Sequence, residues 1–155
     1  MPIGPAWNAD HTANAELATV GTVSGSYTDT HTNDAVYQFV QEVESGGNPS
    51  SRTSHLEHRW SFQITGGTAV SFHVKAYRTN SSDGDAFVFA YSTNGVDYFD
   101  LLTVTKTSDD RQYQSAALPA SLRGTVHIRV RDTDRTPGHR SLDTVFIDHL
   151  FLRSE

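Results

Sequence analysis

The sequence predicts an all-β fold, a two-sheet antiparallel β-sandwich of jelly-roll type with about nine strands. Apolar residues recur at every second position in short runs, which is the pattern of strands with one buried face. Turn-forming pairs such as Gly66-Gly67 and Asn94-Gly95 separate these runs. No stretch of the sequence has the apolar period of an amphipathic helix, so helices contribute little to the predicted fold.

The run 55–64 alternates most clearly, and it places Trp60 and Phe62 on the face that packs into the core. By the same period Phe72, Phe87 and Phe89 face inward. The predicted strands are residues 22–27, 35–43, 55–64, 70–76, 87–91, 100–105, 112–118, 126–130 and 144–152. Residues 1–20 contain two prolines and no regular period, which indicates a linker or an edge segment, and residues 21–155 form the sandwich module.

Composition narrows the class of protein. A chain of 155 residues fits one domain, and a formal charge of −6 disfavours nucleic acid as a partner. No apolar run approaches the roughly 20 residues of a membrane span. The absence of cysteine excludes thiol metal sites, thiol nucleophiles and disulfides. Abundant Thr, Ser and Asn with only two lysines favour a secreted or cell-surface bacterial protein.

Long polar connections gather at one predicted end of the sandwich. If consecutive strands are antiparallel, the connections at that end are residues 44–54, 79–85, 106–111 and 132–142. The connections at the other end are residues 29–34, 65–68, 93–96 and 119–124. Long loops on a rigid scaffold are a common location for binding sites, so we expect the first end to carry function.

Aspartates are concentrated in two of these loops and predict a calcium site. They are Asp83 and Asp85 in one loop, and Asp134 and Asp143 in and after the other. Calcium takes six to eight oxygen ligands, which carboxylates from neighbouring loops can supply together with backbone carbonyls. The alternative is that these residues only form turns and solvate the loops.

Asp148 lies five residues after Asp143 in the last strand, and therefore on the opposite face of the sheet. The two cannot bind the same ion. Asp143 is at the strand's entrance and is the expected ligand. We expect Asp148 to pair with Arg129, Arg131 or a hydroxyl group, because a charge within a sheet needs a partner.

Tyr77 is the aromatic residue best placed for ligand contact, because it falls on the outward set near the Asp83 loop. The apolar face of a sugar ring packs well on a flat aromatic ring, whereas the alternative is a tyrosine that covers its neighbouring strand. The other candidate ligand residues are Arg52, Arg78, Arg135, His139 and Arg140.

No catalytic motif is present. His55 and His58 point to opposite faces of a strand, which does not fit the helical zincin pattern, and there is no Gly-x-Ser-x-Gly or glycine-rich phosphate loop. The chain is therefore expected not to be an enzyme, although paired acids for glycoside hydrolysis need only be close in space and remain an alternative.

Three segments resemble the galactose-binding-like and carbohydrate-binding-module jelly rolls of secreted bacterial proteins. They are DAFVFAYSTNGVDYF at 85–99, VHIRVRDTDRT at 126–136 and LDTVFIDHL at 142–150. The resemblance covers about residues 56–152. It implies a structural calcium ion, which maps onto Asp83, Asp85, Asp134 and Asp143, and a glycan or polysaccharide partner.

The sequence thus predicts a non-catalytic carbohydrate-binding module, appended to other domains of a larger secreted or cell-surface protein, with its loops braced by calcium. The alternative is a structural or adhesive spacer domain that binds no glycan.

Overall fold

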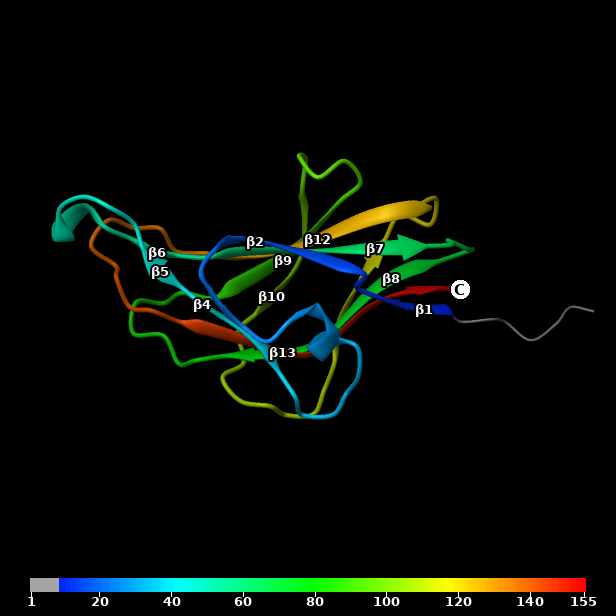
Figure 1. Cartoon of the computed structure of the whole chain (residues 1–155), viewed down its shortest axis with the longest axis horizontal. Helices are drawn as coiled ribbons and strands as arrows, with labels where there is room; N and C mark the ends of the chain where they lie inside the picture. Colours follow the sequence, from blue (N-terminus) through cyan, green and yellow to red (C-terminus); the bar gives the residue numbers. More distant parts are fainter. Residues whose placement is uncertain (1–8) are drawn as a thin grey trace, which may run out of the picture.

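A computed structural model describes residues 9–155 of the chain and has two antiparallel sheets packed face to face, as predicted. In Figure 1 they lie one above the other, with β2, β7 and β12 in the upper layer and β13 in the lower. Sheet A has the order β11-β8-β13-β4-β3, and β1 also pairs with β13. Sheet B has the order β10-β9-β12-β7-β2.

The described residues contain thirteen strands rather than about nine. The strands of sheet A are β1 (Ala9–Thr12), β3 (Thr22–Ser24), β4 (Gln38–Gln41), β8 (Val70–Arg78), β11 (Gln114–Leu118) and β13 (Thr144–Ser154). The strands of sheet B are β2 (Ala15–Val20), β7 (Glu57–Ile64), β9 (Phe87–Ser92), β10 (Phe99–Val104) and β12 (Gly124–Asp132). A short pair, β5 (Val43–Glu44) and β6 (Ser54–His55), and two 3₁₀ helices, η1 (Tyr27–Thr30) and η2 (Pro49–Ser51), complete the fold.

The extra strands arise where pairing partners, rather than apolar period, define a strand. Residues 9–20, for which linker and edge strand were both open, form β1 against β13 and β2 against β7, and residues 1–8 lie outside the described part. Gly21 joins β2 in sheet B to β3 in sheet A with φ at +125°, and an added Cβ there would lie 2.9 Å from Val40. Only glycine fits this crossing without strain.

The core lies between the sheets and confirms the predicted faces. Trp60, Phe62, Phe72, Phe87 and Phe89 are completely buried, and the burial pattern of β7 alternates along its length. Their packing is the main source of stability in a fold without disulfides or α-helices in its described residues.

The core also contains a short polar chain. Trp60 Nε1 donates to Gln38 Oε1 at 2.9 Å, and Gln38 Nε2 donates to Glu16 Oε2 at 2.7 Å. His58 is fully buried and lies 3.4 Å from the same Glu16 oxygen, as expected for a hydrogen-bonded core histidine. These bonds satisfy buried polar atoms that would otherwise oppose folding.

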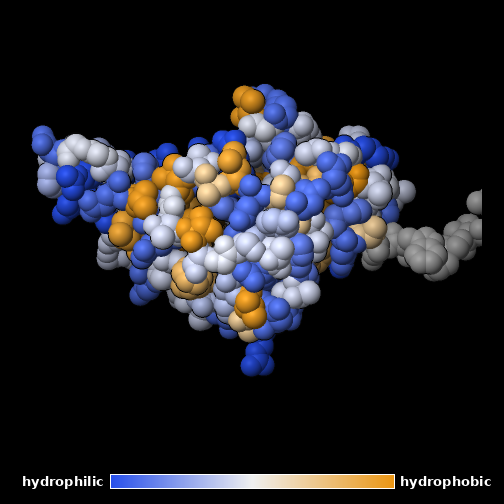
Figure 2. Space-filling view, in the orientation of Figure 1, coloured by the Kyte–Doolittle hydropathy of each residue, from blue (hydrophilic) through white to orange (hydrophobic). Residues whose placement is uncertain are grey.

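Three of the four loops predicted at one end do converge there. Residues 45–53, 79–86 and 133–143 are joined by backbone hydrogen bonds: Gly138 N–H donates to Arg52 O at 2.8 Å, and Thr133 N–H donates to Ala86 O at 3.0 Å. The segment with η2 projects at the left of Figure 1. Figure 2 shows the tip of this end as predominantly hydrophilic.

The fourth loop lies elsewhere. Residues 105–113 connect β10 at the edge of sheet B to β11 at the edge of sheet A, and this crossing carries them onto the outer face of sheet A. There they meet residues 31–37, which include part of the loop 29–34 predicted at the opposite end and the start of the predicted strand 35–43: Tyr37 Oη donates to Asp109 Oδ2 at 2.7 Å. Two loops assigned to opposite ends therefore share one face. No helix within residues 9–155 is long and apolar enough to cross a membrane.

Candidate functional site: an aromatic face and a carboxylate cluster

The outer face of sheet A carries a row of half-buried aromatic rings, which we call the aromatic row: Phe39 on β4, Phe146 on β13 and Tyr77 on β8. Register places them side by side, because Phe146 pairs with Phe39 on one side and with Tyr77 on the other. The Phe146 and Tyr77 rings are stacked with centroids 4.8 Å apart, and the Phe39 and Phe146 centroids are 5.4 Å apart. Tyr37 contacts Tyr77 edge-on at 5.7 Å.

Polar groups flank the aromatic row. Exposed Gln41 and Thr22 are paired with each other one step along the strands, on the same face as Phe39. Ser24 pairs directly with Phe39. A surface of aromatic rings bordered by amide and hydroxyl groups matches a sugar, which has apolar C–H faces and hydroxyls at its rim.

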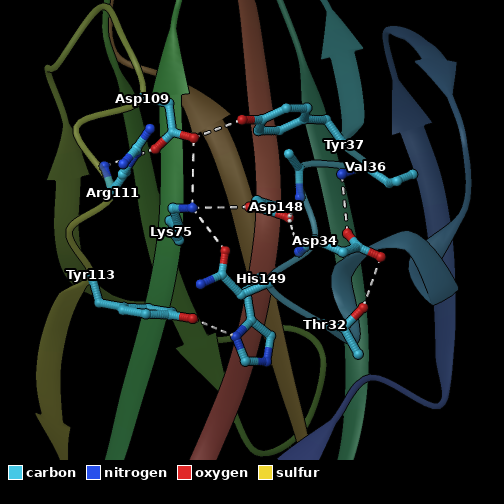
Figure 3. A network of polar contacts seen from close by, with 12 residues as sticks. Thr32, Asp34, Val36, Tyr37, Lys75, Asp109, Arg111, Tyr113, Asp148 and His149 are labelled. Carbon is cyan, nitrogen blue, oxygen red and sulfur yellow. Dashed lines mark hydrogen bonds and ion pairs between the residues drawn. The ribbon is translucent and has the colours of Figure 1, made fainter.

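The other flank is a network that we call the polar bridge (Figure 3). Lys75 Nζ donates to Asn33 Oδ1 at 2.8 Å and Asp148 Oδ2 at 3.1 Å, and it lies 3.5 Å from Asp109 Oδ2. Asp148 Oδ1 accepts the N–H groups of residues 34 and 35 at 3.2 and 3.1 Å. The network fixes both loops on the sheet.

The polar bridge corrects the partner expected for Asp148, which is Lys75 and the backbone rather than Arg129, Arg131 or a hydroxyl. The sequence does not identify Lys75 as this partner, because its role depends on the register between β8 and β13. Although burial opposes the charge of Lys75, its hydrogen bond and ion pair with Asp148 raise the pKa of the ammonium group. The Lys75 ammonium group is therefore charged at neutral pH.

Beyond the polar bridge lies a second aromatic group, formed by His73, His149, Phe151 and Tyr113. The His73 and Phe151 rings are stacked at 4.8 Å, and Tyr113 Oη hydrogen-bonds His149 Nδ1 at 2.8 Å. Burial lowers the pKa of both histidines, so they are neutral near pH 7. Phe151 is only 5% exposed, which makes this group a poorer ring platform than the aromatic row.

The end loops bring three buried carboxylates together: Glu42, Asp85 and Asp143, which we call the buried trio. Each offers an oxygen within 4.8 Å of the others. Glu42 directly follows β4 and Asp143 directly precedes β13, and Glu42 N–H donates to Asp143 O at 2.9 Å. Asp85 arrives from the loop before β9, so the sheet register and one loop assemble the cluster.

Each carboxylate of the buried trio is fixed through hydrogen bonds. Asp85 Oδ1 accepts the backbone N–H groups of residues 86, 133 and 134 at 2.8 to 2.9 Å. Glu42 Oε1 accepts the Asp143 N–H at 2.9 Å. The second oxygens, Glu42 Oε2 and Asp85 Oδ2, are buried and have no hydrogen-bond donor in the described residues. Two rigidly held oxygens are thus left available to a cation or a proton.

The pKa values of the trio also indicate that it needs a cation or a proton. Burial, together with the neighbouring Asp85, raises the pKa of Glu42 from 4.5 to about 9, and burial raises the pKa of Asp143. The described residues place no lysine or arginine in hydrogen-bond contact with the three carboxylates. Three buried carboxyl groups without a cation are unfavourable when all are ionised.

A second cluster, Asp83, Asp134 and His139, lies beside the buried trio. Ser81 Oγ links the two, at 2.6 Å from Asp83 Oδ1 and 2.9 Å from Asp143 Oδ2. Hydrogen bonds from His139 and Thr136 lower the pKa of Asp134 to about 2. Asp134 is therefore largely engaged, whereas the buried oxygen Asp83 Oδ2 has no donor in the described residues.

The structure distributes the sequence-predicted ligand residues over two places. Tyr77 lies in the aromatic row, and Arg78 follows it but is paired with Val145, on the inward side. The remaining four lie in or beside the end loops, in ion pairs within 4.0 Å: Arg52 with Glu44, Arg135 with Asp132, His139 with Asp134, and Arg140 with Glu44.

Sequence reasoning missed Glu42, Phe39 and Phe146. The period of the last strand contains the signal for Phe146, because Val145 and Ile147 are buried on either side of it. No pattern in the sequence marks Glu42, since its role depends on the pairing of β4 with β13.

Comparison with known proteins gives a fold but no family. No family model matches the sequence, and no curated protein matches it. Among solved structures, a family 61 carbohydrate-binding module in complex with β-1,4-galactotriose has a TM-score of 0.52 at 12% identity, covering 93% of this chain and 91% of that chain. A family 4 carbohydrate-binding module has a TM-score of 0.50 at 12% identity, covering 89% and 78%. The chain therefore has the jelly-roll fold of carbohydrate-binding modules, which confirms the resemblance seen in the sequence.

Proposed function

We propose that this chain is a non-catalytic carbohydrate-binding module that belongs to a larger secreted or cell-surface protein. Its glycan lies on the outer face of sheet A. The observation that carries the proposal is the aromatic row of Phe39, Phe146 and Tyr77, which remains partly exposed on a sheet whose other face already has a complete core.

The ligand packs on the rings and hydrogen-bonds the polar groups beside them. Gln41 and Thr22 reach hydroxyls on one side, and the polar bridge of Lys75 and Asp148 holds the loops on the other. The family 61 module with the same fold is described in complex with β-1,4-galactotriose, so galacto-oligosaccharides are the first ligands to test. A face formed by three strands suits a chain of several sugar units.

A calcium ion braces the end loops in this proposal. Glu42, Asp85 and Asp143 supply carboxylate oxygens, two of them without a donor, and Asp83 and Asp134 border the site. Calcium prefers such hard oxygen ligands, and when bound it supplies positive charge that offsets the repulsion of the trio. The ion takes no part in a reaction; its role is to hold the loops 79–86 and 133–143 together.

The glycan proposal is tested by affinity electrophoresis and a glycan array with soluble polysaccharides, galactans included. Tyr77→Ala should weaken binding at least about tenfold, or ~1.4 kcal/mol, because it removes one end of the aromatic row. Phe99→Ala is the matched control, since Phe99 is an exposed aromatic at the edge of sheet B. If the folded protein binds no glycan, the proposal is wrong and the alternative of a structural or adhesive spacer domain is favoured.

A further inference from the structure

The outer face of sheet B, opposite to the aromatic row, carries a cluster of arginines. Arg129 on β12 pairs directly with Arg59 on β7, and Arg131 lies two residues further along β12 on the same face. The chain as a whole has a formal charge of −6, so three neighbouring arginines are a local reversal of its charge.

Among the described residues, only Arg59 of the three has a carboxylate within hydrogen-bond distance, and that carboxylate, Glu57, is also the cross-strand partner of Arg131. Arg59 binds Glu57 with two hydrogen bonds, 2.8 and 3.1 Å long. The Arg129 and Arg131 side chains make no hydrogen bond or ion pair with any of residues 9–155. Arg129 Nε is also buried without an acceptor in this part of the chain. A partly buried guanidinium group without a carboxylate is costly unless an anion binds to it.

Tyr98 holds the Arg129 head in place. Its ring centroid lies 4.2 Å from Arg129 Cζ and 5.2 Å from Arg59 Cζ, so the ring contacts both guanidinium groups. Burial and the nearby charge of Arg131 lower the pKa of Arg129. The surroundings thus fix the position of this cation while opposing its charge.

The neighbouring strand β9 supplies no countercharge to Arg129 or Arg131. On β9, Ala90 pairs with Arg129 and Val88 with Arg131, and neither short side chain can neutralise a charge. The acidic residue in the same row, Asp100, pairs with Ala90 and so lies two strands from Arg129. A guanidinium group presents its N–H donors in a plane that matches the two oxygens of a carboxylate or sulfate group.

We propose that Arg129 and Arg131, with Tyr98 as the support of Arg129, bind an oxyanion group, carboxylate or sulfate, of an acidic saccharide on the outer face of sheet B. The oxyanion chemistry follows from the arginines alone, whereas its assignment to a saccharide rests on the proposed function. The module then has two binding faces, one for neutral sugar rings and one for acidic groups.

Isothermal titration calorimetry with a trigalacturonate, a neutral galactotriose and sodium sulfate tests this proposal. We expect the wild type to bind trigalacturonate more tightly than sulfate, with an affinity that falls as salt rises. Arg129→Gln and the more exposed Arg131→Gln should each weaken trigalacturonate binding about tenfold or more and leave galactotriose binding unchanged. Arg123→Gln removes the same charge from the exposed turn before β12 and should have no effect.

Three results would overturn the assignment. Equal trigalacturonate binding by wild type, Arg129→Gln and Arg131→Gln removes the site. Equal affinity for sulfate and trigalacturonate makes it a site for free anions, and binding of a poly-glutamate peptide but not trigalacturonate makes its partner a protein. If the first of these results is found while Tyr77→Ala loses galactotriose binding, the proposed glycan site on sheet A stands and this inference alone is refuted.

Discussion

Two clusters of charged residues are buried in this protein, and they differ in balance. In the polar bridge, the Lys75 ammonium lies 3.1 Å from the Asp148 carboxylate, and each group has further hydrogen-bond partners. In the buried trio, Glu42, Asp85 and Asp143 are all acidic, and two of their oxygens have no donor in the described residues.

The difference separates a structural cluster from a binding site. A balanced, hydrogen-bonded pair is complete within the chain, so it holds two loops on sheet A and needs nothing else. An unbalanced cluster of like charges needs a proton or a cation in the folded state. The contribution of the trio to stability should therefore depend on calcium and pH. The contribution of the bridge should depend only on its own side chains.

The largest effect is expected at the polar bridge. Lys75→Met should lower the free energy of unfolding by about 3–5 kcal/mol, because it leaves the fully buried Asp148 carboxylate without its cation. Urea unfolding at pH 7 measures the change. The double variant Lys75→Met/Asp148→Asn should be more stable than Lys75→Met alone. A loss below about 1 kcal/mol for Lys75→Met would mean that the pair contributes little.

Calcium should stabilise the protein through the buried trio. A ligand that binds only the folded state adds about 2.7 kcal/mol when its free concentration is 100 times its Kd, so the unfolding temperature should rise between chelator and millimolar calcium. Glu42→Gln keeps the oxygen that accepts the Asp143 N–H and removes the charge, so it should abolish the rise.

Two controls define this calcium response. Asp97→Asn, in the exposed hairpin between β9 and β10, should retain the full response. Lys75→Met should lower the unfolding temperature in both conditions and still retain the rise, because the contacts of Lys75 are with Asn33, Asp109 and Asp148 and not with the trio. An unfolding temperature that is the same in chelator and in calcium would show that the trio is neutralised by a proton instead.

The pH dependence sharpens the contrast further. The pKa of Glu42 is raised to about 9 in the folded state from an ordinary value of 4.5, so between these values the folded protein binds more protons than the unfolded chain. In chelator, the free energy of unfolding should therefore fall as pH rises from 5 to 9, with a slope of at most about 1.4 kcal/mol per pH unit from this group. The contribution of Glu42 to the free energy of unfolding is greatest below pH 4.5.

Saturating calcium should remove that slope, because the ion binds the ionised carboxylates. Glu42→Gln should likewise flatten the profile in chelator. Denaturant titrations at several pH values measure both effects. A profile in chelator that is flat between pH 5 and 9 would contradict the environment described for Glu42.

The apolar part of the fold could be predicted from the sequence. Alternation places Trp60, Phe72 and Phe89 correctly because burial of one face imposes a period of two on each strand. For β1, the sequence leaves an edge strand and a linker as alternatives, and it does not separate β5 from the preceding strand, because both elements are defined by pairing with another segment rather than by their own pattern.

The polar clusters were harder to predict for the same reason. Asp85 and Asp143 could be grouped from their loops, but Glu42 joins them only through the pairing of β4 with β13. Lys75 meets Asp148 where a bulge in β13 shifts the register between residues 147 and 149. A one-residue change of register alters which side chains meet, and the sequence contains no direct signal for it.

The smallest effect is expected at an exposed ion pair, which is balanced like the polar bridge but lies in solvent like the loop tips. Arg52 Nη1 lies 3.2 Å from Glu44 Oε2, and both side chains are about one-third exposed, at 36% and 33%. Water screens this attraction, so Arg52→Gln should change the free energy of unfolding by less than about 1 kcal/mol.

Since Arg52 was a candidate ligand residue, the same variant should be tested for glycan binding. Unchanged binding beside a loss in Tyr77→Ala would place the glycan on the face of sheet A. A loss in Arg52→Gln with unchanged stability would move the ligand to the end loops, next to the buried trio, and would give calcium a direct part in shaping the site.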